Sequence, residues 1–435
     1  MSRGMIRISL LSIALVLLAG CGGSSSGGSG GGGGNGPTTV TFTIDGTPTA
    51  VATKIGSGTF AAATLADNSL TLSLPEGTTN FAVAYVCPGY SDGNYQVTEE
   101  IVVESSTLDG TSYSESCTTT SSPGATGTLT GSVDASAISG TNFMNVIAIG
   151  STFGIGESIG SSDASFSFLA PEGADRVEIL AYDTVLNGYE ESFNLLGAKN
   201  FSDVTVPGAL NGGNTVTLGA ADQVTAKPLT YSNLPTGFGS PTTLVDYMVG
   251  KVGGFMIADA ATTTYPALPA GAMESGDYYY FDSYATGPDP GATNGFAEVT
   301  VETTSTSDGP VSFSFPPAWT YAGPTAATWP SFDLAYSGFS STTNVCGQAS
   351  ILWEPNSTDE EAIVVAASDN YLAGSKTVPI PDLTSLTGFI GAPPSNTEVL
   401  WAAQVLQLNY PCFQSYSPSE ATAKIAFTSG TYTAP

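Results

Sequence analysis

The sequence contains no histidine, and only 9 of its 435 residues are lysine or arginine. Without an imidazole, catalysis by a Ser-His or Cys-His pair is excluded, as is a metal site built on histidine. The 38 acidic residues outweigh the basic ones and give a formal net charge of −29. Because such a surface repels nucleic acid and anionic lipid headgroups, we expect no nucleic-acid partner.

The chain also lacks a convincing helical period in its hydrophobic residues, and only 11% of its residues are charged. Short apolar alternations recur instead between turns of glycine, serine, threonine and proline. Val40, Phe42 and Ile44, for example, alternate with threonines before an Asp-Gly turn. Together with a hydrophobic content of 41%, this pattern predicts an all-β protein whose antiparallel sheets enclose hydrophobic cores.

The N-terminus has the pattern of a secretory signal peptide over residues 1–20. Arg3 and Arg7 precede the apolar run Ile8–Leu18, which is too short to span a bilayer. The run ends in Leu18-Ala19-Gly20-Cys21, which resembles the lipobox of bacterial lipoproteins. The resemblance implies cleavage before Cys21 and attachment of a diacylglyceryl group and a further acyl chain, such as palmitate, to that cysteine.

The residue after Cys21 is Gly22, not the aspartate that marks inner-membrane retention in such lipoproteins, so the resemblance implies an outer-membrane or cell-surface location. The range 21–37 is rich in glycine and serine. This composition forms a flexible coil, with a reach of about 20 Å. We expect it to be a tether that holds a folded body away from the membrane.

Four cysteines remain after Cys21. In an exported protein an even number of cysteines indicates disulfides. We expect Cys87 to pair with Cys117 and Cys346 with Cys412, because the two other connectivities join residues that are far apart in the sequence. Zinc is the competing interpretation, but no paired Cys-x-x-Cys spacing supports it.

An internal similarity divides the body of the chain. Pro75-Glu76-Gly77 and Pro171-Glu172-Gly173 each lie between two alternating apolar segments. A spacing near 100 residues resembles that of tandem immunoglobulin-like or fibronectin type III β-sandwich modules, and a strand ending in Trp353 resembles the opening of the latter type. We expect sandwich modules at 38–122, 125–229 and 330–435 and a β module at 230–329, leaving open whether the last two ranges form one larger unit.

Catalytic signals are weak. Gly156-Glu157-Ser158-Ile159-Gly160 matches the Gly-x-Ser-x-Gly elbow of hydrolases, but the serine has no histidine to take its proton. Carboxylate pairs, such as Asp277 with Asp282 or the run 359–361, are the only plentiful acid and base groups. They also suit calcium, although no Asp-x-Asp-x-Asp-Gly loop occurs. We therefore expect no enzyme, no cofactor and no metal, with weak support for calcium.

Tyrosines and tryptophans gather in the second half of the chain. Their flat rings carry polar handles that suit sugar or protein surfaces. Together with the lipobox resemblance, these aromatic residues favour a lipid-anchored envelope protein. Its expected role is binding, adhesion or structure, directed toward glycan or protein. The alternative is an envelope polysaccharide hydrolase that uses carboxylates. The candidate ligand-binding residues are Tyr278, Tyr280, Tyr284, Trp319 and Trp329.

Overall fold

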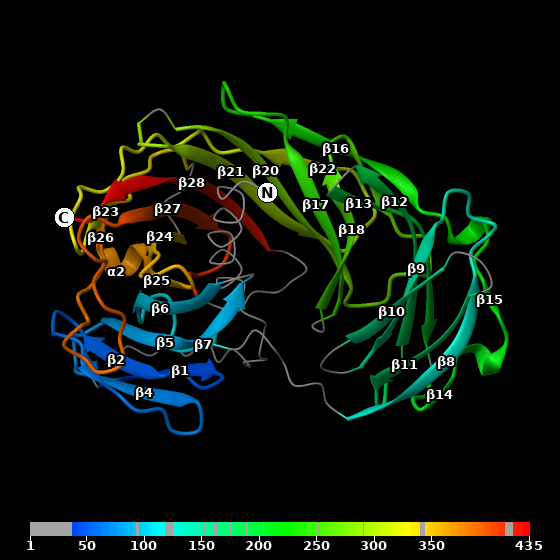
Figure 1. Cartoon of the computed structure of the whole chain (residues 1–435), viewed down its shortest axis with the longest axis horizontal. Coiled ribbons are helices and arrows are strands. Elements are labelled where there is room, and N and C mark those ends of the chain that lie inside the picture. The colour runs from blue at the N-terminus through cyan, green and yellow to red at the C-terminus, as the bar shows by residue number, and fades with distance from the viewer. Residues whose placement is uncertain are drawn as a thin grey trace.

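The computed structural model describes residues 37–92, 95–117, 125–150, 154–160, 164–174, 176–187, 190–202, 204–250, 253–289, 291–339, 344–413 and 421–435. The signal peptide, Cys21 and the tether up to residue 36 lie outside the described residues. The chain is all-β, as the sequence predicts (Figure 1). Helical structure in the described part is confined to α2 (Asp369–Leu372) and the 3-10 turns η1 (Leu210–Gly213) and η2 (Ala220–Asp222). Within these ranges, no helix is long and apolar enough to cross a membrane.

A sheet of sixteen strands runs through the molecule. From one edge to the other it contains β10 (Gly154–Gly160), β9 (Phe143–Ile149), β12 (Arg176–Asn187), β13 (Glu190–Ser202), β18 (Gly253–Ala261), β17 (Thr242–Val249), β20 (Tyr278–Pro288), β21 (Phe296–Ser305), β28 (Thr422–Thr433), β27 (Glu398–Leu408), β24 (Val345–Trp353), β25 (Asp359–Ser368), β6 (Tyr95–Ser106), β5 (Asn80–Asp92), β2 (Ala50–Ile55) and β3 (Ala61–Ala62).

Small sheets pack against this large sheet. In three of these small sheets, the strand that comes first in the sequence pairs antiparallel with the second strand and parallel with the last strand. The small sheets are formed by β1 (Thr38–Asp45), β4 (Ser69–Leu74) and β7 (Ser112–Ser116); by β8 (Thr126–Asp134), β11 (Ala164–Pro171), β14 (Gly208–Ala209) and β15 (Val216–Thr217); by β16 (Thr225–Ser232), β19 (Thr264–Ala267) and β22 (Val311–Ser314); and by β23 (Ser331–Asp333) and β26 (Thr377–Pro379).

Taken in chain order, the strands alternate between the small sheets and the large one in a repeated scheme. One small-sheet strand is followed by two large-sheet strands, a second small-sheet strand and two more large-sheet strands. We call these repeats unit 1 (β1–β7), unit 2 (β8–β15), unit 3 (β16–β22) and unit 4 (β23–β28). Unit 3 begins at Thr225, before the start expected at residue 230.

The Pro-Glu-Gly similarity occupies the same place in two of these repeats. Pro75-Glu76-Gly77 leads from β4 to β5, and the turn at Pro171-Glu172-Gly173 leads from β11 to β12. Gly77 and Gly173 have φ angles of 78° and 74°, a left-handed conformation that favours glycine. The repeated motif is therefore the turn that carries the chain from a small sheet to the large one.

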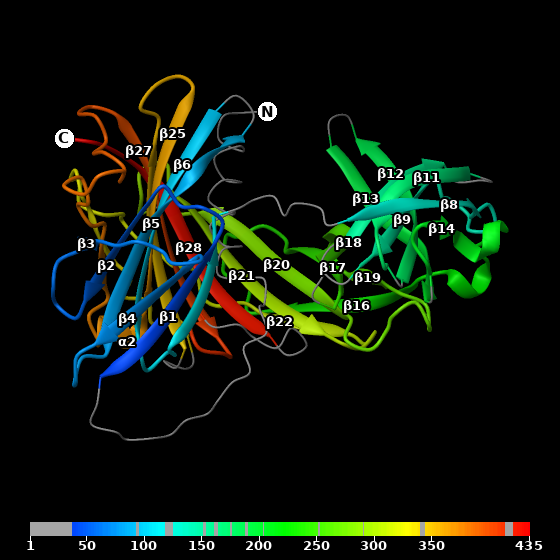
Figure 2. The ribbon, with the colours of Figure 1, turned by 90° about the horizontal axis from the view of Figure 1, so that it is seen from below.

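The units are joined edge to edge in the order 2, 3, 4, 1. Units 1 and 2 follow each other in the sequence but lie at opposite ends of the large sheet, so the chain forms an arch with two lobes (Figure 1). Seen from below, β20 and β21 run obliquely across the space between these lobes (Figure 2). The order of the units places unit 3 between the lobes.

Neighbouring units share cores across the boundaries between the expected modules. Strand β6 of unit 1 pairs in parallel with β25 of unit 4. One core contains Phe42 and Tyr85 of unit 1 together with Leu406 and Ile425 of unit 4. Because each of these apolar surfaces is covered partly by the other unit, unit 1 depends on unit 4 for its stability.

Both predicted disulfides are present and are confirmed: Cys87 with Cys117, and Cys346 with Cys412. Cys87, Cys346 and Cys412 belong to the core shared by units 1 and 4, and Cys117 packs against it. The two bonds therefore both stabilise the region around the core shared by units 1 and 4, rather than each stabilising a different end of the chain.

Candidate ligand-binding face

Strand registers show which face of the large sheet each small sheet covers. Val299 of β21 lies opposite Ala426 of β28, and these residues belong to the cores under the small sheets of units 3 and 4. Ile425, on the other face of β28, belongs to the core under the small sheet of unit 1. In unit 2, Ile179 contributes to the core under that unit's small sheet, whereas Leu180 joins the core of unit 3.

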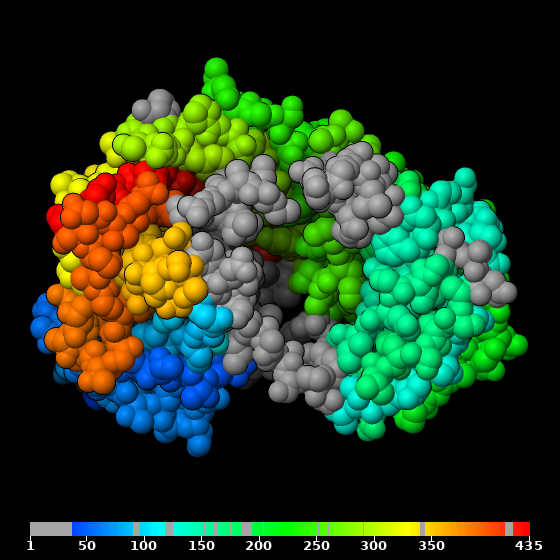
Figure 3. Space-filling view, viewed as in Figure 1, coloured from blue at the N-terminus to red at the C-terminus, as the bar shows by residue number. Residues whose placement is uncertain are grey.

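Units 1 and 2 thus place their small sheets on the face of the large sheet opposite to the one that units 3 and 4 cover. Within the described ranges, no small-sheet strand covers this second face in unit 3. The space-filling view shows the molecule hollowed between its lobes (Figure 3). The second face of unit 3 is therefore a candidate site between two flanking lobes.

Alternation along β20 and β21 puts polar residues on this face. Tyr279 and Phe281 point into the core of unit 3, so Tyr280, Asp282 and Tyr284 lie on the opposite side of the sheet. Glu302 is directly opposite Asp282 in the register of β21. These residues, all partly buried, and their carboxylate neighbours form what we call the acidic tyrosine face: Asp246, Asp259, Tyr280, Asp282, Tyr284, Glu298 and Glu302.

The carboxyl groups on this face are crowded and poorly solvated. Burial raises the pKa of Glu298 to about 7, and the nearby charge of Asp282 adds to the effect. Burial also raises the pKa of Asp282, with a further contribution from Asp246. The pKa of Glu302 is raised by burial and by Asp282, although the Tyr280 hydroxyl, which donates a hydrogen bond to it, opposes the shift. Ionising every carboxyl group on this face at once would therefore cost free energy.

Asp282 lies at the centre of this arrangement. Its Oδ1 atom is shielded from solvent and accepts no hydrogen bond. A buried acceptor without a partner is costly, and burial accordingly favours the protonated form of this carboxyl group. In the described part of the chain, no group of three or more acidic or cysteine side chains has an arrangement that could hold a metal ion.

The structure separates the predicted aromatic residues. Tyr280 and Tyr284 lie on the acidic tyrosine face, whereas Tyr278 is buried. Trp319 is 6% exposed and stacks on Tyr321 in the core of unit 4. Trp329 packs against that same core and donates a hydrogen bond to Asp382. The predicted aromatic residues therefore do not form one patch, and a direct ligand contact remains a prediction.

The carboxylate pair Asp277 and Asp282 is also divided. Asp277 receives hydrogen bonds from Arg176 Nη1 at 3.0 Å and from the Tyr247 hydroxyl at 2.5 Å. Arg176 forms a second ion pair with Glu178, which is completely buried. This network joins β12 of unit 2 to unit 3, and it gives the carboxylate of Asp277 partners other than Asp282.

The other acidic candidates and the serine candidate are either buried within the fold or engaged in hydrogen bonds. Glu360 is 3% exposed within β25, and Asp359 accepts a hydrogen bond from Asn356. Burial raises the pKa of Glu361, and the charge of Asp359 adds to this shift. Ser158 donates a hydrogen bond to Asn145 on the neighbouring strand β9. The Gly-x-Ser-x-Gly match therefore lies within strand β10 and not at a strand-to-helix elbow.

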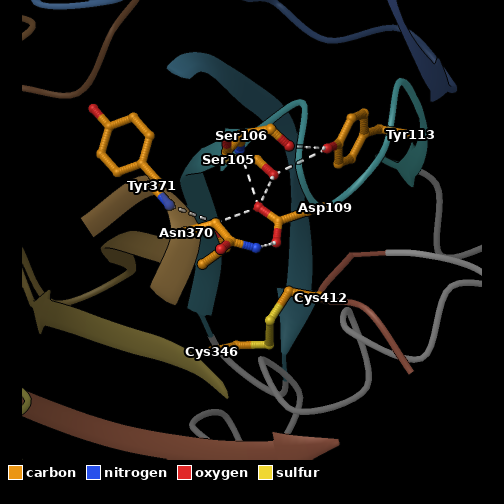
Figure 4. The surroundings of a disulfide bond; sticks show 9 residues. Ser105, Ser106, Asp109, Tyr113, Cys346, Asn370, Tyr371 and Cys412 are labelled. Carbon is orange, nitrogen blue, oxygen red and sulfur yellow. Dashed lines mark hydrogen bonds between the residues drawn. A yellow bond between two sulfur atoms is a disulfide. The ribbon is translucent and has the colours of Figure 1, made fainter. Parts of the chain in front are cut away.

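Another buried carboxylate, Asp109, lies near the Cys346–Cys412 disulfide (Figure 4). Its Oδ2 atom accepts hydrogen bonds from the Ser368 hydroxyl at 2.5 Å and from the Ser106 backbone N–H at 3.1 Å, and Oδ1 accepts one from Asn370 at 2.6 Å. Both carboxylate oxygens thus have partners from units 1 and 4. Asp109 joins these units and has no oxygen left without a partner.

Sequence reasoning did not identify Asp246, Glu298 or Glu302 as site residues. A signal was present in the alternation of Glu298, Thr300 and Glu302 with two valines, which places acidic groups on one face of a strand. The proximity of Glu298 and Glu302 to Asp282 depends on the pairing of β20 with β21, and that of Asp246 depends on the pairing of β17 with β20. No local pattern specifies either register.

Comparisons with known proteins add little to this description. No protein-family model matches the chain, and no curated protein matches it. A crystal structure described as a "putative adhesin" from Bacteroides ovatus is similar with a TM-score of 0.18 and 10% sequence identity, covering 48% of this chain and 99% of that chain. A similarity this weak supports no argument about fold or function. Both are therefore inferred from the strands and from the geometry of the face.

Proposed function

We propose that the chain is a lipid-anchored protein of the cell envelope that binds a ligand on the acidic tyrosine face. The observation that carries this proposal is the location of Tyr280, Asp282 and Tyr284 on a partly exposed sheet face that belongs to none of the hydrophobic cores. Tyrosine rings that present both apolar area and a hydroxyl are typical of binding surfaces.

The test uses the whole chain, purified in detergent, on panels of glycans and of envelope proteins. We expect at least one class to bind, with binding lost in Tyr284→Ala and retained in Tyr284→Phe, because the phenylalanine keeps the ring. Ligands that bind Tyr284→Ala as well as they bind the unchanged protein would place the binding site elsewhere.

One observation favours a second function, the polysaccharide hydrolase. Asp282 and Glu302 are neighbours across two strands, and the pKa of each is raised, so one carboxyl group can stay protonated beside an ionised one, as glycoside hydrolysis requires. A hydrolysis screen with polysaccharides separates the two functions. Turnover that is lost in both Asp282→Asn and Glu302→Gln would favour the hydrolase over simple binding.

A further inference from the structure

Asp282 and Glu302 belong to one row of side chains that crosses four strands of the large sheet. The register places them directly opposite each other on β20 and β21, on the acidic tyrosine face. The next residue of the row beyond Asp282 is Leu244 of β17, and beyond Glu302 it is Ala423 of β28. The two carboxyl groups therefore lie between apolar neighbours in the row, and each is the polar neighbour of the other.

Two carboxylates in this position repel each other. Side chains directly opposite in an antiparallel pair have Cβ atoms about 4.5–5.5 Å apart, which brings two carboxyl groups within reach of a hydrogen bond. The Oδ1 atom of Asp282 is shielded from solvent and has no hydrogen-bond partner among the described residues. A proton on Glu302 would give this oxygen a donor and would remove the repulsion at the same time.

The surroundings of the pair favour the same proton. The other titratable groups of the face are acidic and are distributed over four strands: Asp246 on β17, Asp259 on β18, Tyr280 and Tyr284 on β20, and Glu298 on β21. On β28, Lys424 is opposite Val301 and so lies on the other face of the sheet. Burial raises the pKa of both Asp282 and Glu302, and the charge of Asp282 adds to the shift of Glu302.

The pair is connected to the rest of the face and to the arch. The hydroxyl of Tyr280 donates a hydrogen bond to Glu302. Strands β20 and β21 run across the space between the two lobes (Figure 2). A change of charge on the pair therefore acts on the strands that connect the lobes and on a tyrosine of the proposed binding face.

We infer that Asp282 and Glu302 share one proton and form a pH-sensitive switch between β20 and β21. With the proton in place, a hydrogen bond between carboxyl and carboxylate holds the two strands together at this position. When the proton is lost, two adjacent carboxylates repel each other and loosen the strand contact that positions Tyr280. This inference goes beyond the proposed function, and it applies whether or not a ligand is bound.

The direction of the switch follows from the shifts. In the folded state the pKa of each group is raised above its value in the unfolded chain. The pair therefore stabilises unit 3 at acidic pH, and this contribution is lost as the pH rises through the raised values. Unit 3 should accordingly be tightest in acid and loosest in alkali.

The first measurement follows ionisation of the pair by infrared spectroscopy of the whole chain in detergent, from about pH 5 to about pH 9. Subtracting the spectrum of the double variant Asp282→Asn/Glu302→Gln isolates the bands of the pair. In each single variant we expect the proton affinity of the remaining carboxyl group to fall at least about tenfold, because the like charge across the strands is gone. Burial alone would leave that affinity unchanged.

Glu298→Gln is the matched control for this titration. Glu298 lies on the same strand and the same face, and burial raises its pKa to about 7. It is opposite Thr286, however, and not opposite an acid. Its replacement should change the proton affinity of the pair by about threefold at most. The melting temperature of each variant shows whether it is folded.

The second measurement is native-state hydrogen exchange of the whole chain, corrected for the intrinsic effect of pH on the exchange rate. We expect amides of β20 and β21 to lose protection between about pH 6 and about pH 9, whereas amides of β27 and β28 keep theirs. The double variant cannot ionise at these positions, so its β20 and β21 should stay protected. Glu172→Gln, in an exposed turn, should behave as the unchanged protein does.

Three results would overturn the inference. They are the absence of a protonated carboxyl band from the pair at neutral pH, an unchanged titration of the remaining group in both single variants, and an equal loss of protection in the double variant. The binding test with Tyr284→Ala is separate. Failure of the switch leaves the proposed function standing, and failure to find a ligand leaves the switch standing.

Discussion

Glu100 shows how a single side chain couples the stability of this fold to pH. It is 1% exposed on β6, and one carboxylate oxygen accepts a hydrogen bond from the Ile390 backbone N–H at 3.1 Å while the other has no partner. Burial raises its pKa from 4.5 to about 7, opposed by that hydrogen bond. The folded state therefore binds a proton that the unfolded state releases, and this contribution to stability is lost as the pH rises from about 4.5 to about 7.

The variant Glu100→Gln removes this titration. We expect its free energy of unfolding, relative to that of the unchanged protein, to rise by about 3 kcal/mol between pH 4.5 and pH 8. Urea unfolding at a series of pH values measures the difference, with Glu76→Gln as the control for an exposed glutamate. A difference that stays constant across this range would mean that Glu100 does not titrate as described.

Arg176 is a second residue whose replacement has a specific expected cost. Replacing it by methionine leaves Glu178 and Asp277 as buried charges without a cation, which should destabilise the protein by about 3–5 kcal/mol. Lys227→Met breaks only the more exposed ion pair with Asp308 and should cost less than about 1 kcal/mol. Similar costs for the two variants, measured by urea unfolding, would contradict the structural role of the network.

At the scale of residues, some features are accessible from the sequence because they depend on local order. The cysteine pairing followed from the short separations in the chain, and the alternation in β20 separates Tyr280 from Tyr279 by strand geometry alone. The division of Asp277 from Asp282 was not accessible, because it depends on the contact of Asp277 with Arg176, which lies 101 positions away.

At the scale of elements, the sequence predicts strands and turns but not which strands meet. The segment Thr38–Asp45, the Pro-Glu-Gly turns and the strand at Val311 were all recognisable from alternation and turn residues. The pairing of β6 with β25 was not, because it joins segments more than 250 residues apart and runs parallel in a mainly antiparallel sheet. Alternation specifies on which face of the sheet a residue lies, but it does not specify which strand pairs with its own.

This pairing makes unit 1 dependent on unit 4. The fragment 38–122 expressed alone should remain unfolded or aggregate, since it exposes the edge of β6 and the apolar core that Leu406 and Ile425 cover. Mixed during refolding with the fragment 125–435, it should form a stable complex that co-elutes in gel filtration. A fragment 38–122 with a cooperative thermal transition of its own would contradict the dependence of unit 1 on the shared core.

At the scale of the whole molecule, the arrangement of units 2, 3, 4 and 1 in one sheet places the acidic tyrosine face between lobes from units adjacent in the sequence. The sequence predicts β modules held on a tether, and the turn motif indicates the repetition for units 1 and 2 only. The arch itself arises from edge-to-edge pairing between units, for which no motif is visible.

The tether and lipid anchor remain a prediction that a single substitution tests. Cys21→Ser removes the acceptor for lipid, so we expect the protein to move from the membrane fraction to the soluble fraction. Cys21→Ser that still sediments with membranes after a high-salt wash would contradict the anchor. A Gly22→Asp variant that moves from the outer to the inner membrane would support the lipoprotein resemblance independently.

The central claim is that unit 3 binds a ligand through its acidic tyrosine face. The most direct measurement is the difference in ligand binding between the whole unchanged chain and the variants Tyr284→Ala and Asp282→Asn, with Glu172→Gln as the control. We predict that both site variants lose binding of the same ligand while the control and the melting temperatures stay unchanged. A ligand bound equally by all four proteins would contradict the claim.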